Sequence, residues 1–367
     1  MAEAQNILLT GTGTGVGRAL LFALVRKSLH RIAILMRESG EYPAAQRAAR
    51  LFDGLGFTRD ERARLEVLPG TLTSDGFGLR TAQQARLAET LDLIIHTAEE
   101  PSLTAERALS EVVNRTGTAN ALLFAGQCFG SGPLRRFIHL STAFVAGSGS
   151  RGIIREDELP TAPVHLNNYE WSKYEGERIV RAAMQAGLPA TVFRPGIMIR
   201  SEAADGKTYG GDVILPLLRL IANRWITSLP INGQARVAVA PVDFVVEAIT
   251  RALDAEWTTG LTFHLILPQP PTVADLFNLD GAFTDAAQHP QLCAAEDFDA
   301  SLCSAHEREL LETVGCYLPY FNSRLTFEMR NTARLVGSSV RDANYLNRLR
   351  SYLAAALASD SIRQAAA

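Results

Sequence analysis

The chain has 367 residues, of which 47% are hydrophobic and 20% are charged, and its formal net charge is −3 at pH 7. This length and apolar content suffice for a large buried core, and the weakly negative charge argues against a nucleic-acid-binding protein, which normally carries a basic face. The stretch MAEAQNILLT lacks the pattern of a signal peptide. No apolar run reaches the roughly 18 residues needed to cross a bilayer.

The cysteines and histidines show no spacing typical of a metal site. The four cysteines form no CxxC pair, and the seven histidines form no HExxH motif. We therefore expect no metal and a reducing, cytoplasmic location. The cysteines are Cys128, Cys293, Cys303 and Cys316.

Short apolar runs alternate with helical stretches over the first two hundred residues. The predicted strands are NILLT (6–10), RIAILM (31–36), RLEVLPG (64–70), LDLIIHTA (91–98), RRFIHLS (135–141) and ATVFRPG (190–196). Helical segments such as 17–30 and 108–128 lie between them. Repeated strand-helix units require a parallel sheet covered on both faces, so we predict an α/β, doubly wound Rossmann fold that binds ligands at the carboxyl ends of its strands.

The alternation weakens after about residue 200, where SEAADGKTYGGD (201–212) is typical of a loop. We expect a dinucleotide-binding domain over 1–200, completed by 236–267. Residues 201–235 and 268–367 are expected to form a smaller, mostly helical C-terminal substrate-binding cap. Aromatic and basic residues interleave in 317–337, which suits either a packed cap or a surface for an acidic carrier protein.

A glycine-rich turn, TGTGTGVG (10–17), directly follows the first predicted strand and opens a helix. Glycines let the backbone approach a pyrophosphate, whose charge is met by amide groups and the helix N-terminus. The chain has no GxSxG elbow and no GxxxxGK[ST] loop, so the serine-hydrolase and P-loop classes lack their central residues.

Tyr169 and Lys173 stand four residues apart in the predicted helix NNYEWSKYEGERIV (167–180), so they share one face. Such a pair also occurs on ordinary solvated helices. The functional interpretation is acid catalysis, because a nearby cation lowers the pKa of a phenol from about 10 toward working pH.

Over about residues 6–265 these features resemble an extended short-chain dehydrogenase/reductase. The further motifs are HTA (96–98), NRTGT (114–118), LSTAFVAG (140–147) and RPG (194–196). LTSDGFGL (72–79), VFRPGIM (192–198) and APVDFVVEAI (240–249) are similar to the male sterility-like NAD-binding branch. That branch includes fatty acyl reductases and the thioester reductase domains of carboxylic acid reductases and nonribosomal peptide synthetases.

The resemblance implies three catalytic residues. Tyr169 would donate a proton to a carbonyl oxygen, Thr142 would hold that oxygen, and Lys173 would lower the pKa of Tyr169 and bind the nicotinamide ribose. The implied cofactor-binding residues are Gly11, Thr12, Gly13, Thr14, Gly15, Val16, Gly17, Arg37, Arg47, Thr71, Leu72, Thr97, Ala98, Asn114, Tyr169, Lys173, Pro195, Gly196 and Ile197. Asn114 could equally be structural, and we expect His96 and His139 to be core residues.

Two positions depart from the pattern of extended members. Thr14 occupies a place where these proteins usually have glycine, and Thr71-Leu72 replaces the usual Asp-Leu that holds the adenine. The second predicted strand runs into Arg37, whose guanidinium suits a 2′-phosphate, so we predict NADPH as the cofactor. Arg47 would be a second donor, and Glu38 is the rival that would favour NAD.

The resemblance implies an NADPH-dependent reductase of an acyl thioester, carried by an acyl carrier protein or coenzyme A, that yields an aldehyde or alcohol. The alternative enzymes are an NADP-dependent carbonyl (keto) reductase and a sugar-nucleotide epimerase or dehydratase. A non-catalytic dinucleotide sensor is a further alternative, but it would be expected to lose the tyrosine.

Overall fold

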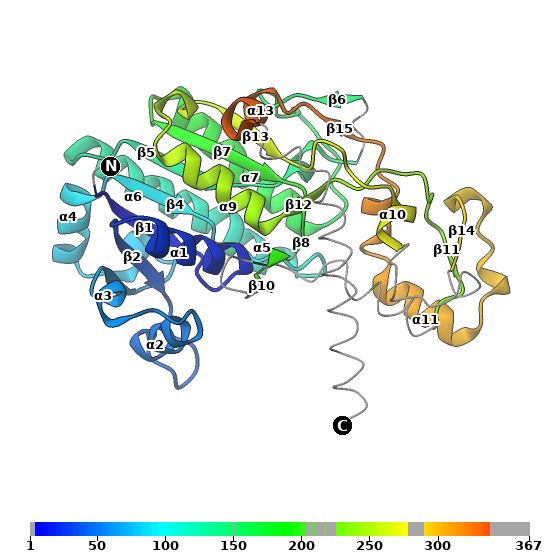
Figure 1. Cartoon of the computed structure of the whole chain (residues 1–367), viewed down its shortest axis with the longest axis horizontal. Coiled ribbons are helices and arrows are strands. Elements are labelled where there is room, and N and C mark those ends of the chain that lie inside the picture. The colour runs from blue at the N-terminus through cyan, green and yellow to red at the C-terminus, as the bar shows by residue number, and fades with distance from the viewer. Residues whose placement is uncertain are drawn as a thin grey trace.

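The computed structural model describes residues 4–148, 150, 152–199, 201–202, 208–209, 217, 225–277 and 290–337. At its centre is a sheet of seven parallel strands in the order β13-β7-β5-β4-β1-β2-β3 (Figure 1). The bounds are β1 (Asn6–Thr10), β2 (Arg31–Met36), β3 (Leu65–Pro69), β4 (Leu93–His96), β5 (Arg136–Leu140), β7 (Ala190–Pro195) and β13 (Thr262–Leu265). The predicted doubly wound fold and all six predicted strands are confirmed.

The strand order reverses between β1 and β4, which pair in parallel with Leu8 opposite Ile94. In folds of this kind ligands bind where the order reverses. The glycine-rich turn follows β1 and the HTA motif follows β4, so this topology brings both to the same edge of the sheet.

Helices cover both faces of the sheet, because the strands are apolar on both sides (Figure 1). Ile7 and Leu9 belong to the core cluster on the side of α1 and α9, whereas Leu8 belongs to the cluster on the side of α4 and α6. On the first face lie α1 (Gly15–Lys27), α2 (Ala44–Gly54), α9 (Val242–Leu253) and α13 (Arg330–Val336); on the second lie α4 (Thr81–Thr90), α6 (Gly117–Ser131) and α7 (Asn168–Gln185).

Shorter elements connect these layers. A π-helical turn, η2 (Glu111–Thr116), joins α5 (Arg107–Ser110) to α6. Beyond β7 the chain enters β8 (Ile197–Ile199), which pairs with β12 (Val239–Pro241). The other short elements are α3 (Arg59–Arg62), η1 (Asp75–Gly78), η3 (Ala143–Ala146), β6 (Ile153–Ile154), β9 (Ser201–Glu202), β10 (Thr208–Tyr209) and η4 (Glu256–Thr258).

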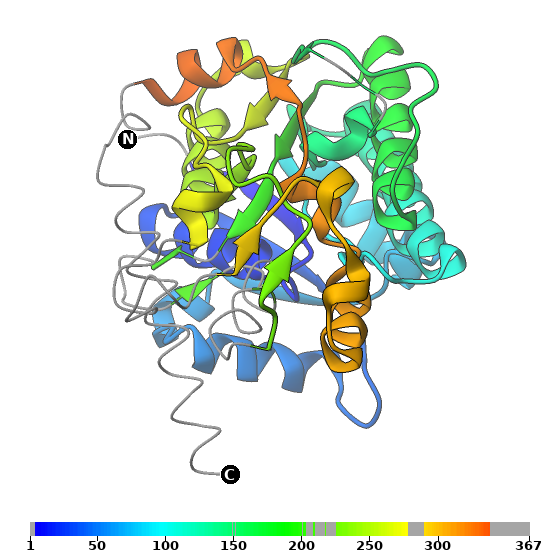
Figure 2. The same ribbon diagram turned by 90° about the vertical axis from the view of Figure 1, so that its right-hand side faces the viewer.

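The described part of the predicted cap packs around an apolar cluster that includes Ile226, Leu229, Val314 and Phe321, and this cluster also takes in residues of β8 and β12. Its elements are β11 (Ser228–Leu229), α10 (Val273–Phe277), β14 (Gln291–Leu292), η6 (Ala295–Asp297), η7 (Ala300–Leu302), α11 (Ala305–Val314) and α12 (Leu318–Phe321). Figure 2 shows α11 and its neighbours in orange, beside the sheet. Residues 203–207, 210–216, 218–224, 278–289 and 338–367 of the predicted cap lie outside the described residues.

The chain returns to the sheet after α12. β15 (Thr326–Phe327) pairs with β6, and α13 packs on α9 and β13 (Figure 2). The buried Glu156 carboxylate fastens this return, since it accepts hydrogen bonds from the backbone N–H of Asn331 at 2.6 Å and of Thr332 at 3.3 Å. The predicted division at residue 268 stays a proposal. Residues 326–336, which the prediction assigned to the cap, lie against the dinucleotide-binding domain in the structure.

Candidate active site

A cavity of about 700 Å³ follows the carboxyl ends of the central strands. Its walls come from the glycine-rich turn, the segments that follow β2, β3, β4, β5 and β7, and from α7 and α12. The cavity-lining residues that the sequence predicted are Gly11, Thr12, Gly13, Thr14, Gly15, Val16, Arg37, Arg47, Thr71, Leu72, Ala98, Thr142, Tyr169, Gly196 and Ile197. Gly17, Thr97, Asn114, Lys173 and Pro195 are not among the lining residues.

The glycine-rich turn is held by very close backbone contacts. Gly11 has a φ of +89°, and a Cβ there would lie 2.4 Å from the backbone nitrogen of Ala98. A Cβ on Gly17 would lie 2.1 Å from the carbonyl oxygen of Gly11. Both positions therefore require glycine.

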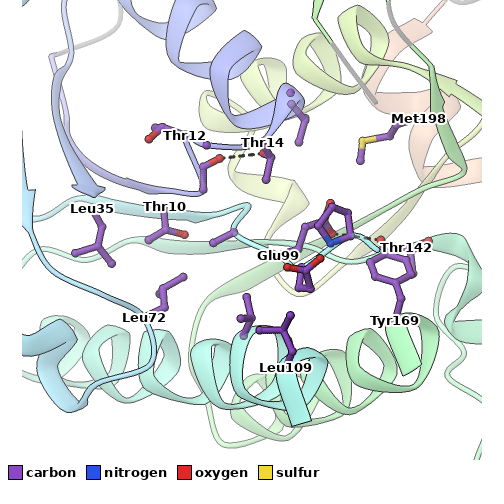
Figure 3. Close-up of a pocket in the computed structure, with 18 of the residues that line it drawn as sticks. Thr10, Thr12, Thr14, Leu35, Leu72, Glu99, Leu109, Thr142, Tyr169 and Met198 are labelled. Atoms are coloured by element: carbon purple, nitrogen blue, oxygen red, sulfur yellow. Dashed lines mark hydrogen bonds between the residues drawn. The ribbon is translucent and has the colours of Figure 1, made fainter. Parts of the chain in front are cut away.

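Thr14 caps α1 and explains the unusual glycine spacing. Its hydroxyl donates to the carbonyl oxygen of Gly11 at 2.9 Å and accepts from the amide of Gly17 at 3.1 Å (Figure 3). The first turn of α1 thus faces the cavity at Gly15 and Val16. Exposed amides at a helix N-terminus fit the pyrophosphate of a dinucleotide.

Two arginines lie at the far end of the cavity. Arg37 lines it directly after β2, and Arg47 from α2 donates a hydrogen bond to the carbonyl oxygen of Arg37. The rival Glu38 is exposed and is not a lining residue. Thr71 also lines this end, with its hydroxyl 3.0 Å from the hydroxyl of Thr73. No carboxylate takes the place of the usual aspartate at position 71.

The other end of the cavity holds the predicted catalytic residues. Tyr169 and Lys173 share one face of α7, as predicted, and Thr142 follows β5 (Figure 3). The Lys173 ammonium is buried, donates to the carbonyl oxygen of Leu140 at 2.6 Å and lies 3.1 Å from the Glu99 carboxylate. The Tyr169 hydroxyl donates to the same Glu99 carboxylate at 3.2 Å. Glu99 therefore joins the two residues.

The prediction that the pKa of Tyr169 is lowered is wrong. Burial raises the pKa of this phenol well above its usual value, and the negative charge of Glu99 and then the neighbouring Tyr320 raise it further. A hydrogen bond with Thr142 acts in the opposite direction. The Lys173 ammonium does not bring the pKa of Tyr169 down, because it is paired with the Glu99 carboxylate.

Sequence reasoning missed two residues of this end. Glu99 stands in HTAEEPS, directly after a buried strand, and a carboxylate at that place was a usable signal for a site residue. Tyr320 also lines the cavity, and its hydroxyl donates to Glu170 at 2.6 Å and accepts from Asn167 at 2.8 Å. No local pattern connects Tyr320 to a helix some 150 residues earlier in the chain.

Asn114 supports the site from behind. It lies buried in the π turn, where its Nδ2 donates to the Ser172 hydroxyl at 2.8 Å and its Oδ1 accepts from the Glu100 amide at 2.7 Å.

His96 is hydrogen-bonded to Thr10 and stacks on His139, and burial lowers the pKa of His96 to about 3. Both histidines are core residues, as expected.

Within the part of the chain that the structure describes, no group of three or more His, Cys, Asp or Glu side chains is arranged to hold a metal ion. The helices in this part of the chain are all too short or too polar to span a membrane.

Comparisons with known proteins identify the family. Residues 9–249 match the NAD-binding family described as Male sterility protein. The glycine betaine reductase of Emericella nidulans is 27% identical over 286 residues, which cover 76% of this chain and 22% of that protein. The chain thus spans about a quarter of the length, or less, of the curated relatives it matches.

Solved structures share the fold. The terminal R domain from the myxalamid PKS-NRPS biosynthetic pathway superposes with a TM-score of 0.80 at 21% identity, covering 98% of this chain and 92% of that one. A thiolation-reductase di-domain from an archaeal non-ribosomal peptide synthetase gives 0.71 at 21% identity, covering 96% and 75%. The predicted class of nicotinamide-dependent oxidoreductase is confirmed. The chain belongs to the male sterility-type NAD-binding family.

Proposed function

We propose that this chain uses NADPH to reduce an acyl thioester, carried by an acyl carrier protein or coenzyme A, to an aldehyde or, after a second hydride transfer, an alcohol. The observation that carries the proposal is a single cavity with Arg37 and the glycine-rich turn at one end and Thr142 and Tyr169 at the other. The R-domain and thiolation-reductase structures support the choice of a carrier-linked substrate.

The dinucleotide end fits NADPH. The first turn of α1 would hold the pyrophosphate, and Arg37, with Arg47 behind it, would hold the 2′-phosphate. Among the described residues, no acidic side chain that could accept a hydrogen bond from the 2′-hydroxyl of NAD lines this end of the cavity, since Glu38 lies off it. When bound, the nicotinamide supplies the hydride.

Thr142 and Tyr169 would act on the substrate oxygen. Hydride addition to the carbonyl carbon places negative charge on this oxygen, where Thr142 donates a hydrogen bond and Tyr169 delivers its proton. The carbon–sulfur bond then breaks as the hydroxyl proton returns to Tyr169, and the leaving thiolate takes a proton from water, so one thioester, one hydride and one proton give one aldehyde and one thiol. The hydrogen bonds strengthen as the charge forms, which lowers the barrier.

The lining of the catalytic end favours an acyl substrate over a sugar nucleotide. Leu103 and Phe144, which line the cavity and share an apolar cluster with Tyr320, are both apolar. An acyl chain gains from contact with such a wall, whereas sugar hydroxyls would lose hydrogen bonds to water. We propose that the described cap contributes Tyr320 to the same wall, since its ring packs edge-on against Phe144 at 4.8 Å.

The test is a substrate panel with the purified chain and NADPH, followed by nicotinamide absorbance and by direct detection of aldehyde and free thiol. The panel holds an acyl carrier protein thioester, the matching acyl coenzyme A, a ketone and a UDP-sugar. We expect the chain to reduce at least one thioester. One thiol should be released for each thioester that accepts a first hydride, and a second hydride transfer should release none. Turnover of the ketone or sugar nucleotide alone would favour the alternative enzymes, and cofactor binding without any turnover would favour the sensor.

A further inference from the structure

Glu99 is held in place from both sides of its loop. The preceding Thr97 hydroxyl donates to the carbonyl oxygen of Thr10 at 2.7 Å. The following Glu100 is clamped through its backbone, with its amide donating to Asn114 Oδ1 at 2.7 Å and its carbonyl oxygen accepting from Asn114 Nδ2 at 3.1 Å. These hydrogen bonds fix the backbone on both sides of Glu99, whose side chain lines the cavity.

The Glu99 carboxylate is buried, with 3% of its side chain exposed, and a buried carboxylate requires partners. Its partners are the Tyr169 hydroxyl at 3.2 Å and the Lys173 ammonium at 3.1 Å. Tyr169 is the proposed proton donor, and Lys173 is the residue predicted from the sequence to bind the nicotinamide ribose. Figure 3 shows the Glu99 side chain reaching into the cavity beside Thr142 and Tyr169.

We propose that Glu99 is a positioning residue that keeps Tyr169 in its proton-donating form up to alkaline pH. The inference rests on the proposed function, in which reduction needs a protonated Tyr169. A carboxylate that accepts the phenol hydrogen opposes the formation of a second negative charge beside it. The same carboxylate pairs with Lys173, so the ammonium is not free to stabilise a phenolate.

Four groups face the Tyr169 hydroxyl from four segments of the chain. They are Glu99 after β4, Thr142 after β5, Lys173 on α7 and Tyr320 on α12. Burial is the largest cause that raises the pKa of Tyr169, followed by Glu99 and then Tyr320, whereas Thr142 lowers it. Tyr320 is itself fixed by Glu170. Glu99 is thus the one carboxylate among these four, and its removal tests the charge directly.

The proton path follows from this arrangement. Tyr169 gives its proton to the substrate oxygen as hydride reaches the carbon, and rotation about the phenol C–O bond turns its hydrogen away from Glu99. The phenolate formed beside a carboxylate is a strong base, so it regains a proton from the hydroxyl of the reduced carbon or from water. In this path the Glu99 carboxylate exchanges no proton with the substrate and keeps its contact with Lys173.

The experiment compares Glu99→Gln with Glu100→Gln, an identical change at the neighbouring position, where the carboxylate accepts from the Ser102 amide. Tyrosinate absorbance is followed against pH in cofactor-free protein, and the same titration of Tyr169→Phe is subtracted to isolate Tyr169. We expect the Tyr169 midpoint to fall by about one pH unit or more in Glu99→Gln. In Glu100→Gln it should stay at the parent value.

A second measurement is the alkaline limb of the pH profile for reduction. It should move to lower pH in Glu99→Gln, which loss of packing alone would not cause. If Glu99→Gln does not fold, Glu99→Asp keeps the charge but draws the carboxylate back from the Tyr169 hydroxyl, and it should give a smaller shift in the same direction. A Tyr169 midpoint in these folded variants at or above the parent value overturns the proposal.

The titration also separates this inference from the proposed function. It needs neither cofactor nor substrate, so a lowered midpoint supports the role of Glu99 even if the parent reduces no thioester. An unchanged midpoint in a chain that does reduce thioesters overturns the role of Glu99 and leaves the proposed function standing.

Discussion

The two ends of the cavity are built in different ways. At the dinucleotide end, one stretch of eight residues, 10–17, forms a strand end, a turn and a helix start, and its shape is fixed by contacts between backbone atoms. At the catalytic end, side chains from four distant segments meet: Glu99, Thr142, Tyr169 and Tyr320. The first end depends on local conformation, and the second depends on the whole fold.

This difference explains why one end was predicted more fully than the other. Glycine at positions 11 and 17 indicates the backbone geometry directly, because a side chain at either position would overlap backbone atoms. The protonation of Tyr169, in contrast, depends on which charges the fold brings near it. The spacing of Tyr169 and Lys173 was correctly interpreted as one helical face, but burial of the phenol, together with the charge of Glu99, raises the pKa of Tyr169 instead of lowering it.

The largest effect is expected from breaking the catalytic end alone. Tyr169→Phe removes the proposed acid but keeps the ring, so turnover should fall by at least about a hundredfold, the low end for loss of a general acid. Cofactor affinity should stay near the parent value, because the dinucleotide end is untouched. Steady-state rates and cofactor titration by fluorescence measure the two quantities. Near-full turnover in this variant would remove Tyr169 from the proposed mechanism.

The second effect is expected from breaking the dinucleotide end alone. Arg37→Ala removes a charge-assisted contact to the 2′-phosphate, so catalytic efficiency with NADPH should fall by about 1.5 to 3 kcal/mol, roughly 10- to 150-fold. Efficiency with NADH should change little. The control is Arg50→Ala, which removes an arginine of α2 that packs on Tyr42 and does not line the cavity. Equal losses with both cofactors, or a parent that prefers NADH, would contradict the assignment.

The central fold could be predicted because its signals are local. The runs at 6–10 and 31–36 became β1 and β2 with the predicted bounds, since a short apolar run between turn residues leaves few alternatives. For the same reason, most of the residues predicted to bind the dinucleotide lie in the lining of the cavity, while their role stays a prediction. Thr14 was noted as a departure, but its role as the helix cap became visible only in the structure.

Buried charge networks could not be predicted, because they join residues far apart in sequence. Arg194 belongs to the RPG motif but is fully buried and lies 2.6 Å from the Glu177 carboxylate on α7, which also accepts from Ser141 at 2.7 Å. Glu156, which holds the start of α13, is a similar case. A sequence pattern treats charged residues as exposed unless a partner is visible nearby, and here the partners come from other elements.

The third prediction tests whether backbone contact alone sets the dinucleotide end. Gly17→Ala places a methyl carbon where the Gly11 carbonyl oxygen lies 2.1 Å away, so α1 must move relative to the turn at a cost on the order of 1–3 kcal/mol. We expect weaker cofactor binding and a lower melting temperature. The same change at Gly126, which is exposed in α6 with no atom within 4 Å of the added carbon, should instead stabilise the protein by about 1 kcal/mol, because alanine favours helix. Calorimetry should therefore show a lower melting temperature in Gly17→Ala and a higher one in Gly126→Ala. Cofactor titration should show weaker binding in Gly17→Ala alone. Parent-like cofactor affinity in Gly17→Ala would mean that the turn tolerates a side chain and that its close contact does not define the site.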